Sequence, residues 1–260
     1  MEIIGIVGGR SFRLQSPGIE ISILQSFGED QPRHFGAKNA TSQPLSVEGF
    51  TGNTDQGGSC NVYELSMIPH CNGTHTETAE HLEKQSLFPF HGISQPFYPG
   101  RLVTVPLTSD LEQETYQGHK PRDLFVTKKN LLKAAPWYSG FIEGGSIVIR
   151  TSPNPETKKT AQWDVTHPAP FFTEEAMRFL GSLPFQHLIV DFPSLDRTHD
   201  EGRLKNHREF FKDKSRTVTE MAYVPDGVKD GHYFVSIQVP LLALDAVPSR
   251  LVLYQAKEIV

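Results

Sequence analysis

The chain has 260 residues, of which 37% are hydrophobic and 21% are charged, and its formal net charge is −5 at pH 7. This composition is typical of a folded globular protein and not of a disordered or fibrous one. Because a nucleic-acid-binding surface needs a concentrated positive field, the net negative charge argues against such a partner.

The N-terminus and the two cysteines bear on the compartment. The sequence opens MEIIGIVGG, with an acidic residue where a signal peptide needs a basic one, and the apolar run is short. The sequence contains no run of about 18 apolar residues, the length that a membrane-spanning helix needs. Cys60 and Cys71 do not suggest a disulfide framework, and Cys60 is expected to be buried. We therefore expect a cytoplasmic protein that does not enter the membrane.

Strand-like runs recur along the chain. The opening IGIVGG predicts a strand followed by a glycine turn, and it lacks the third glycine of a dinucleotide-binding loop. Further runs are rich in β-branched and aromatic residues and bounded by Gly, Pro or Asp, which predicts strands at residues 19–24, 60–68, 101–107, 145–151, 187–192, 232–241 and 249–256. Residues 25–58 are polar and glycine-rich without a clear period, so this long segment is a candidate lid.

Helical patterns are fewer. Residues 127–135 begin at Thr127, a suitable N-cap, and end before a proline. Residues 173–183 begin at a second threonine, carry two acidic residues in the first turn and place their apolar side chains on one face. They lead into HLIVDF, 187–192, whose continuous apolar run is typical of a strand buried on both faces. The basic segment 203–216 fits the solvated face of a helix.

The order of these elements indicates the fold class. A helix followed by a buried strand, late in a sequence that is otherwise mostly strand, indicates an α/β fold. No internal repeat or low-complexity linker divides the chain. We therefore expect a single α/β domain over residues 1–260, mostly β with a few helices.

Residues 70–81, HCNGTHTETAEH, concentrate histidine, cysteine and glutamate. Imidazole, thiolate and carboxylate are the groups that bind zinc and other first-row transition metals. Spacings of four, two and four residues separate Cys71, His75, Glu77 and His81. His75 and Glu77 would share one face of an extended segment, and the HExxH pattern of a metalloprotease helix is absent. The stretch predicts a metal site, although a plain surface loop can have the same composition.

The same stretch resembles the signature H-x-G-T-H-x-D-x-P-x-H of the cyclase family of metal-dependent hydrolases, which includes bacterial kynurenine formamidase and isatin hydrolase. GGSIVIRTS, 144–152, resembles the family's GD-x-V-L-I-R-T strand, and residues 171–196, which end in HLIVDFPSLD, resemble its later helix and strand. The likeness runs from about residue 19 to residue 255. It implies the swivelling β/β/α fold of the cyclase family.

The resemblance also implies roles for individual residues. His75 matches the second metal-ligating histidine, and Glu77 occupies the position of an aspartate that binds one metal or bridges two. His81 matches the histidine proposed as the general acid/base. His207, in LKNHREFF, and Glu220, in TVTEMAYV, match a later histidine and a later glutamate of the metal site.

Two positions depart from the family pattern. Cys71 stands where the family has its first metal-ligating histidine, four residues before His75, and the adjacent His70 is the alternative ligand. A cysteine ligand would favour zinc, because thiolates suit zinc better than manganese. Glu77 is one methylene longer than aspartate, which leaves the number of metals at one or two. We expect zinc, with manganese as the alternative.

Other candidate residues have interpretations of their own. His167 fits a turn before a helix, and Asp191, at a strand end, either orients a ligand or satisfies backbone groups. Ser194 and Asp196 resemble a family loop that packs beneath the site. An apolar wall for an aromatic substrate is a possible role of Phe88, Phe90 and Trp137.

The resemblance implies a metal-dependent, arylformamidase-like hydrolase that cleaves a linear or cyclic amide of a small molecule, with His81 moving the proton. The absence of a G-x-S-x-G motif argues against a serine hydrolase. The alternative is a catalytically inactive member of the fold that binds a metal or a small molecule, which the departures at Cys71 and Glu77 motivate. The resemblance also implies a homodimer or larger homo-oligomer, with residues 25–58 as the candidate interface.

Overall fold

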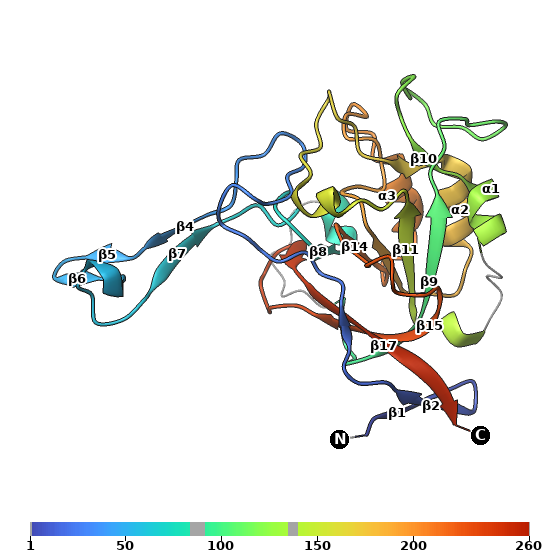
Figure 1. The fold of residues 1–260 in the computed structure, drawn as a ribbon. Helices are drawn as coiled ribbons and strands as arrows, with labels where there is room; N and C mark the ends of the chain where they lie inside the picture. Colours follow the sequence, from blue (N-terminus) through green and yellow to red (C-terminus); the bar gives the residue numbers. More distant parts are fainter. Residues whose placement is uncertain (1, 84–91, 135–139, 260) are drawn as a thin grey trace.

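The computed structural model describes residues 2–83, 92–134 and 140–259, and its main element is one sheet of eleven strands (Figure 1). The strands follow the order β1-β2-β17-β15-β9-β11-β13-β14-β8-β16, and β3 pairs with β17 beside this path. Their bounds are β1 Ile4–Val7, β2 Arg10–Leu14, β3 Ile19–Glu20, β8 His75–Glu77, β9 Tyr98–Pro106, β11 Ser146–Ser152, β13 His187–Val190, β14 Thr217–Glu220, β15 Gly231–Gln238, β16 Ala246–Pro248 and β17 Arg250–Ile259.

The centre of the sheet is parallel and buried on both faces. β9, β11, β13 and β14 pair in parallel, and antiparallel strands continue the sheet on either side. On β11, Ile147 and Ile149 join one core, whereas Val148 joins the other. The first core is covered by helices α1, Lys128–Ala134, and α2, Glu174–Gly181 (Figure 1). The predicted burial of the HLIVDF strand on both faces is confirmed.

The helices begin where the sequence predicts. Thr127 Oγ1 and Thr173 Oγ1 each accept a hydrogen bond at 3.1 Å from a backbone N–H three residues later, which is N-capping. The basic segment forms a third helix, α3, Lys205–Phe210. Its basic side chains lie largely in solvent, as predicted, but the opposite side of the helix buries His207 and Phe210. Segment 203–216 therefore has a buried face as well as a solvated one.

An arm leaves the body of the protein between residues 41 and 66 (Figure 1). Its stem pairs β4, Thr41–Pro44, with β7, Tyr63–Ser66, and its outer part holds β5 Ser46–Val47, β6 Phe50–Thr51 and the 3-10 helix η1 Thr54–Gln56. The arm has no core of its own, and Cys60, which lies in it, is exposed. The expectation that Cys60 is buried was therefore wrong.

Smaller elements complete the fold. β10 Phe125–Val126 pairs in parallel with β12 Phe171–Phe172, and three more 3-10 helices are η2 Ala79–Leu82, η3 Gly140–Ile142 and η4 Glu156–Thr160. The predicted N-terminal strand and turn are confirmed as the β1–β2 hairpin. In the described parts of the chain, no helix has the length and apolar character that a membrane crossing needs. The predicted α/β class, mostly sheet with a few helices, is confirmed.

Candidate metal centre

Two strands and one short helix bring four of the predicted residues together. His75 and Glu77 lie two residues apart on β8, and both are buried. Glu220, the last residue of β14, lies directly across from His75 in the antiparallel pair. His207 enters from α3 and is also buried. We call these four residues, His75, Glu77, His207 and Glu220, the inner cluster.

His75 presents an unprotonated nitrogen to this cluster. Its Nδ1 lies 3.0 Å from the carbonyl oxygen of Gly73, and because a carbonyl only accepts, Nδ1 carries the proton. Nε2 then holds a lone pair 3.4 Å from Glu220 Oε2. This buried Nε2 has no hydrogen-bond partner among the described residues. A lone pair that faces a carboxylate is repulsive unless a positive charge lies between the two groups.

Asp196 orients His207 in the same way. Asp196 Oδ2 accepts a hydrogen bond from the backbone N–H of His207 at 3.0 Å and lies 2.8 Å from its Nδ1. The other ring nitrogen, Nε2, faces Glu77 Oε1 at 3.1 Å and Glu220 Oε1 at 3.6 Å. Metal-binding histidines are commonly held by a carboxylate at the nitrogen that faces away from the metal.

Burial and neighbouring charges shift the pKa values of the inner-cluster residues in opposite directions. Burial alone would raise the pKa of Glu77, but the charge of His207, whose Nε2 lies 3.1 Å from Oε1, and the contact with His70 hold it well below its usual value. Burial and Glu77 raise the pKa of Glu220, but His207 outweighs them, so this pKa is lowered too. Burial lowers the pKa of His207, yet Glu77 and Asp196 lift it well above the usual range. Two ionised carboxylates at this depth need a compensating positive charge.

The donor set fits a divalent metal ion. Imidazole nitrogens and carboxylate oxygens are ligands that zinc and manganese both accept. Glu77 Oε1 is buried and, in the described part of the chain, has no hydrogen-bond partner of acceptable geometry. Ligand atoms within 4.8 Å of one another join His70, His75 and Glu77 in one group, and Glu77, His81 and His207 in another. Glu77 belongs to both groups.

A second group lies beside the first, and we call it the outer cluster: His70, His81 and Asp245. Asp245 Oδ2 lies 2.9 Å from His70 Nε2 and 3.1 Å from His81 Nδ1. His70 also connects the two clusters, because its Nδ1 lies 3.1 Å from Glu77 Oε2. Burial lowers the pKa of His70, but hydrogen bonds to Asp245 and Glu77 raise it to about 10.

Cys71 lies at the edge of the centre. Its sulfur belongs to none of the ligand groups that the described residues form, whereas His70 belongs to two. Backbone hydrogen bonds from Cys71 and Asn72 to the carbonyl of Ile68, at 2.9 and 3.1 Å, form a turn here. Cys71 is half-buried and lines the adjoining cavity, and burial, with a smaller effect of Glu220, raises the pKa of its thiol to about 11.

Two aspartates that orient the histidines were not assigned these roles from the sequence. Asp196 was expected to pack beneath the site, and the structure shows that it contacts His207 directly. Asp245 was not singled out at all. It is 164 residues from His81 in the sequence and reaches it only because β16, which follows Asp245, pairs with β8. No local pattern in the sequence signals that pairing.

A cavity of about 710 Å³ adjoins both clusters. Glu77, His81 and His207 are part of its lining. His34 also lines it and has a buried Nδ1 without a hydrogen-bond partner among the described residues. Burial lowers the pKa of His34 to about 4, so its ring is neutral near pH 7. The rings of Phe35 and His199, which also line the cavity, lie 4.8 Å apart.

The remaining candidates lie elsewhere or have structural partners. His167 forms the predicted turn, since its backbone N–H donates to Asp164 Oδ1 at 2.9 Å and its side chain is exposed. Asp191 is buried at the end of β13 and pairs with Lys158 at 2.7 Å. Ser194 lines the cavity. The proposed aromatic wall, Phe88, Phe90 and Trp137, lies outside the described residues.

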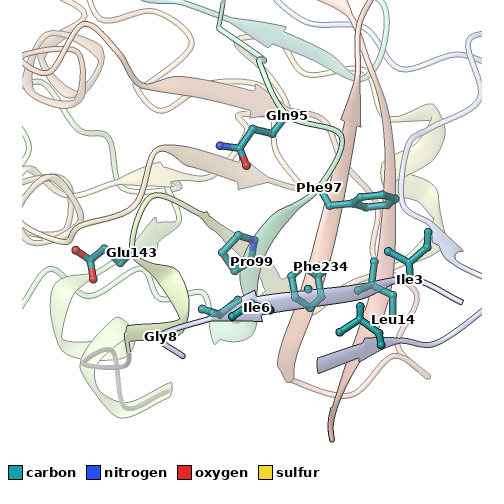
Figure 2. Close-up of a pocket in the computed structure, with 12 residues that line it drawn as sticks. Ile3, Ile6, Gly8, Leu14, Gln95, Phe97, Pro99, Glu143 and Phe234 are labelled. Carbon is teal, nitrogen blue, oxygen red and sulfur yellow. The ribbon is translucent and has the colours of Figure 1, made fainter. Parts of the chain in front are cut away.

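A second cavity, of about 460 Å³, lies beside the N-terminal hairpin (Figure 2). Apolar side chains such as Ile6, Phe97 and Phe234 dominate its lining, and Glu143 is the one charged residue among the described residues that line it. Among the residues that the structure describes, it shares no lining residue with the cavity at the histidine clusters, and nothing in that lining resembles a metal or catalytic site.

Comparison with known sequences identifies the family. The family described as "Putative cyclase" matches residues 20–197, which is more than half of the chain. The chain therefore belongs to this cyclase family, and the resemblance noted in the sequence is confirmed. No curated protein matches the chain.

Solved structures share the fold. A potential metal-dependent hydrolase with cyclase activity matches with a TM-score of 0.60 and 17% identity, over 92% of this chain and 98% of its own. A predicted metal-dependent hydrolase from Bacillus stearothermophilus matches with a TM-score of 0.60 and 18% identity, over 91% and 97%. Isatin hydrolase A from Labrenzia aggregata matches with a TM-score of 0.57 and 14% identity, over 91% and 93%. At these identities the likeness establishes the fold, and it confirms the predicted cyclase-like architecture.

Proposed function

We propose that this protein hydrolyses a linear or cyclic amide of a small molecule with the help of a divalent metal ion in the inner cluster. The observation that carries the proposal is the lone pair of His75 Nε2, which faces Glu220 Oε2 with no hydrogen between them. A cation between the two groups removes this repulsion. The solved structures that share this fold support the class of reaction, because they include metal-dependent hydrolases and an isatin hydrolase.

Zinc is the proposed ion, and manganese is the alternative. His75, Glu77, His207 and Glu220 would hold one ion or two, depending on whether Glu77 contacts both; Glu220 joins this set through its contacts with His75 at 3.4 Å and His207 at 3.6 Å. We propose His70 as a further ligand in preference to Cys71, because its Nδ1 faces Glu77 while the sulfur lies in no ligand group of the described residues. A bound divalent ion supplies Lewis-acid chemistry, which polarises a carbonyl group and makes a water molecule more acidic.

His81 is the proposed general acid/base. It lies in the 3-10 helix η2 and lines the cavity, and its side chain is 26% exposed. Since Nδ1 is engaged by Asp245, Nε2 is the nitrogen that remains free to accept a proton. His81 would take a proton from the attacking water and pass it to the leaving nitrogen, a role typical of histidine in amide hydrolysis.

The side chains that line the cavity suit a planar substrate. Phe35 and His199 provide ring faces, and the neutral imidazole of His34 provides a hydrogen-bonding group within the same lining. An N-formyl aryl amine or a cyclic aryl amide such as isatin combines a flat ring with an amide carbonyl. The proposed activity is therefore arylformamidase-like.

Metal analysis combined with a substrate panel tests this proposal. We expect the purified protein to contain zinc or manganese by elemental analysis, and to hydrolyse at least one N-formyl aryl amine or cyclic amide in an ultraviolet absorbance assay. Protein that lacks both metals and gains no hydrolysis when either is added would refute the proposal. Full metal occupancy without turnover across amides, esters and lactones would instead support the inactive binding protein.

The expected homo-oligomer and cytoplasmic location stay predictions. The arm at residues 41–66 supports an oligomer, because it exposes Val47, Tyr63 and Leu65. Sedimentation velocity of the full chain checks the prediction directly. A monomer at micromolar concentration would contradict it, and replacing the three apolar residues by serine shows whether the arm takes part.

A further inference from the structure

Asp245 occupies a fixed place at the edge of the metal centre. It directly precedes β16, which pairs with β8, the strand that carries His75 and Glu77. The backbone N–H of Thr78 donates to the Asp245 carbonyl oxygen at 3.1 Å, so the main chain is held beside the site. The carboxylate has no role in the chemistry proposed above except as a neighbour of His81.

One oxygen of this carboxylate serves two histidines. Asp245 Oδ2 lies 2.9 Å from Nε2 of His70 and 3.1 Å from Nδ1 of His81, and the two rings are 4.3 Å apart. An aspartate carboxylate is ionised near pH 7 and has no hydrogen to donate, so Oδ2 can only accept. Each of these two nitrogens must therefore carry a hydrogen.

This arrangement selects opposite tautomers in the two rings. His70 directs Nε2 toward Asp245, so Nδ1, 3.1 Å from Glu77 Oε2, is the nitrogen that faces the inner cluster, and a metal ion bound there would take the place of its hydrogen. His81 is protonated on Nδ1, which leaves Nε2 as its basic nitrogen. A carboxylate that fixes the tautomer of a histidine controls whether the ring can bind a metal or accept a proton.

We propose that Asp245 is a positioning residue that fixes the tautomers of His70 and His81 together, so that one ring offers Nδ1 to the metal and the other offers Nε2 for the proton that passes from the attacking water to the leaving nitrogen. This inference rests on the proposed function. It goes further because it makes one carboxylate, remote in the sequence, responsible for both metal binding and proton transfer.

The outer cluster is better explained by positioning than by a third metal site. Ligand atoms of His70, His81 and Asp245 do lie within 4.8 Å of one another. However, the nitrogens of both rings that face Asp245 are already paired with its oxygen at hydrogen-bond distances. In the inner cluster, His75 Nε2 and Glu77 Oε1 find no such partner among the described residues. The atoms without a hydrogen-bond partner identify the metal position, and Asp245 Oδ2, which is paired with both rings, identifies the support.

The test is a direct measurement of the tautomers. Nitrogen-15 labelling of histidine and long-range proton–nitrogen correlation spectra report which ring nitrogen carries the hydrogen in the zinc-loaded protein. We expect His81 to carry it on Nδ1 and His70 on Nε2. In Asp245→Ala, both rings should lose this fixed state, and kcat and zinc affinity should each fall by about 10- to 100-fold. In Asp245→Asn, whose amide oxygen still accepts a hydrogen bond, kcat and zinc affinity should lie between those of the native protein and those of Asp245→Ala.

Asp230→Asn is the matched control. Asp230 is a carboxylate of similar exposure, 39% against 36% for Asp245, and it accepts hydrogen bonds from Thr104 and Arg150 away from the histidines. The Asp230→Asn substitution should leave the tautomers of His70 and His81 unchanged. A wild-type His81 protonated on Nε2, or unchanged tautomers in Asp245→Ala, would overturn the inference even if activity falls. If no amide is hydrolysed at all, the proposed function fails, while the spectra still decide the role of Asp245.

Discussion

The inner and outer clusters use the same side chains in opposite ways. In the inner cluster, His75 directs Nε2, which carries no hydrogen, toward Glu220, which has none to offer in return. In the outer cluster, His70 and His81 direct N–H groups toward an aspartate that accepts both. The first arrangement is favourable only around a cation, and the second is complete without one. Histidines and carboxylates alone therefore do not define a metal site. The hydrogen-bond partner of the ring nitrogen that faces away from the cluster decides whether the other nitrogen can bind a metal.

The largest expected effect comes from breaking the inner cluster. Glu77→Gln keeps the size of the side chain but removes a charge that contacts both ligand groups. We expect zinc stoichiometry to fall to near zero and hydrolysis to fall below detection, with loss of the rise in melting temperature that added zinc gives the native protein.

The control for this prediction is Asp191→Asn, which removes a buried carboxylate paired with Lys158 outside the centre. It should lower the melting temperature and leave zinc stoichiometry unchanged. Zinc binding that survives Glu77→Gln would show that the inner cluster is not the metal site.

The next effect separates chemistry from metal binding. His81→Ala removes the proposed acid/base and leaves every member of the inner cluster in place. We expect kcat to fall by about 10²- to 10⁴-fold, the range for loss of a general acid/base, with zinc content unchanged. His167→Ala, in an exposed turn, is the control and should have the native rate. Loss of zinc in His81→Ala would place this residue among the ligands.

A smaller effect, on zinc affinity, decides whether His70 or Cys71 is the ligand where the two clusters meet. His70→Ala should weaken zinc binding by about 10- to 100-fold, because it removes a ring between Glu77 and Asp245. Cys71→Ser should leave zinc affinity unchanged, since the sulfur belongs to none of the ligand groups that the described residues form. Competition with a chromogenic zinc chelator measures both variants. The reverse result would assign the ligand to Cys71, as its four-residue spacing from His75 suggests.

The sequence predicted what local pattern controls. Alternation along an extended segment placed His75 and Glu77 on one face, and threonine N-caps placed the starts of α1 and α2. It did not separate His70 from Cys71, because the turn at Ile68 decides which of two adjacent side chains enters the centre.

The long-range contacts were beyond the sequence for a different reason. Asp245 reaches His81 through the pairing of β16 with β8, and strand pairing across such a separation leaves no periodic signal. Asp196 was assigned to the right loop but not to its contact with His207. The resemblance to the cyclase family supplied His207 and Glu220, which a reading of each residue in isolation would have left as surface and strand positions.

The smallest effect at pH 7 concerns His187, a buried histidine that belongs to neither cluster. It tests whether burial or a neighbouring carboxylate sets the charge of the buried histidine rings. His187 is fully buried against Tyr98, its Nδ1 lies 2.7 Å from Thr217 Oγ1, and burial lowers its pKa to about 3 from the usual 6.5. Because the unfolded chain takes up a proton below pH 6.5 and the folded one does not, this histidine favours folding above pH 6.5, and that contribution is lost as the pH falls toward 3.

Replacing this ring by one that cannot titrate isolates its contribution. In His187→Phe, the fall in unfolding free energy between pH 7 and pH 4, followed by urea denaturation, should be smaller than in the native protein by on the order of 3 kcal/mol. Tyr98→Phe, which alters the same packing without a group that titrates in this range, should keep the native pH dependence. An unchanged slope in His187→Phe would mean that His187 takes up its proton in the folded state. Burial without a carboxylate partner would then be insufficient to keep a histidine neutral in this protein, and the contrast with His207 would lose its basis.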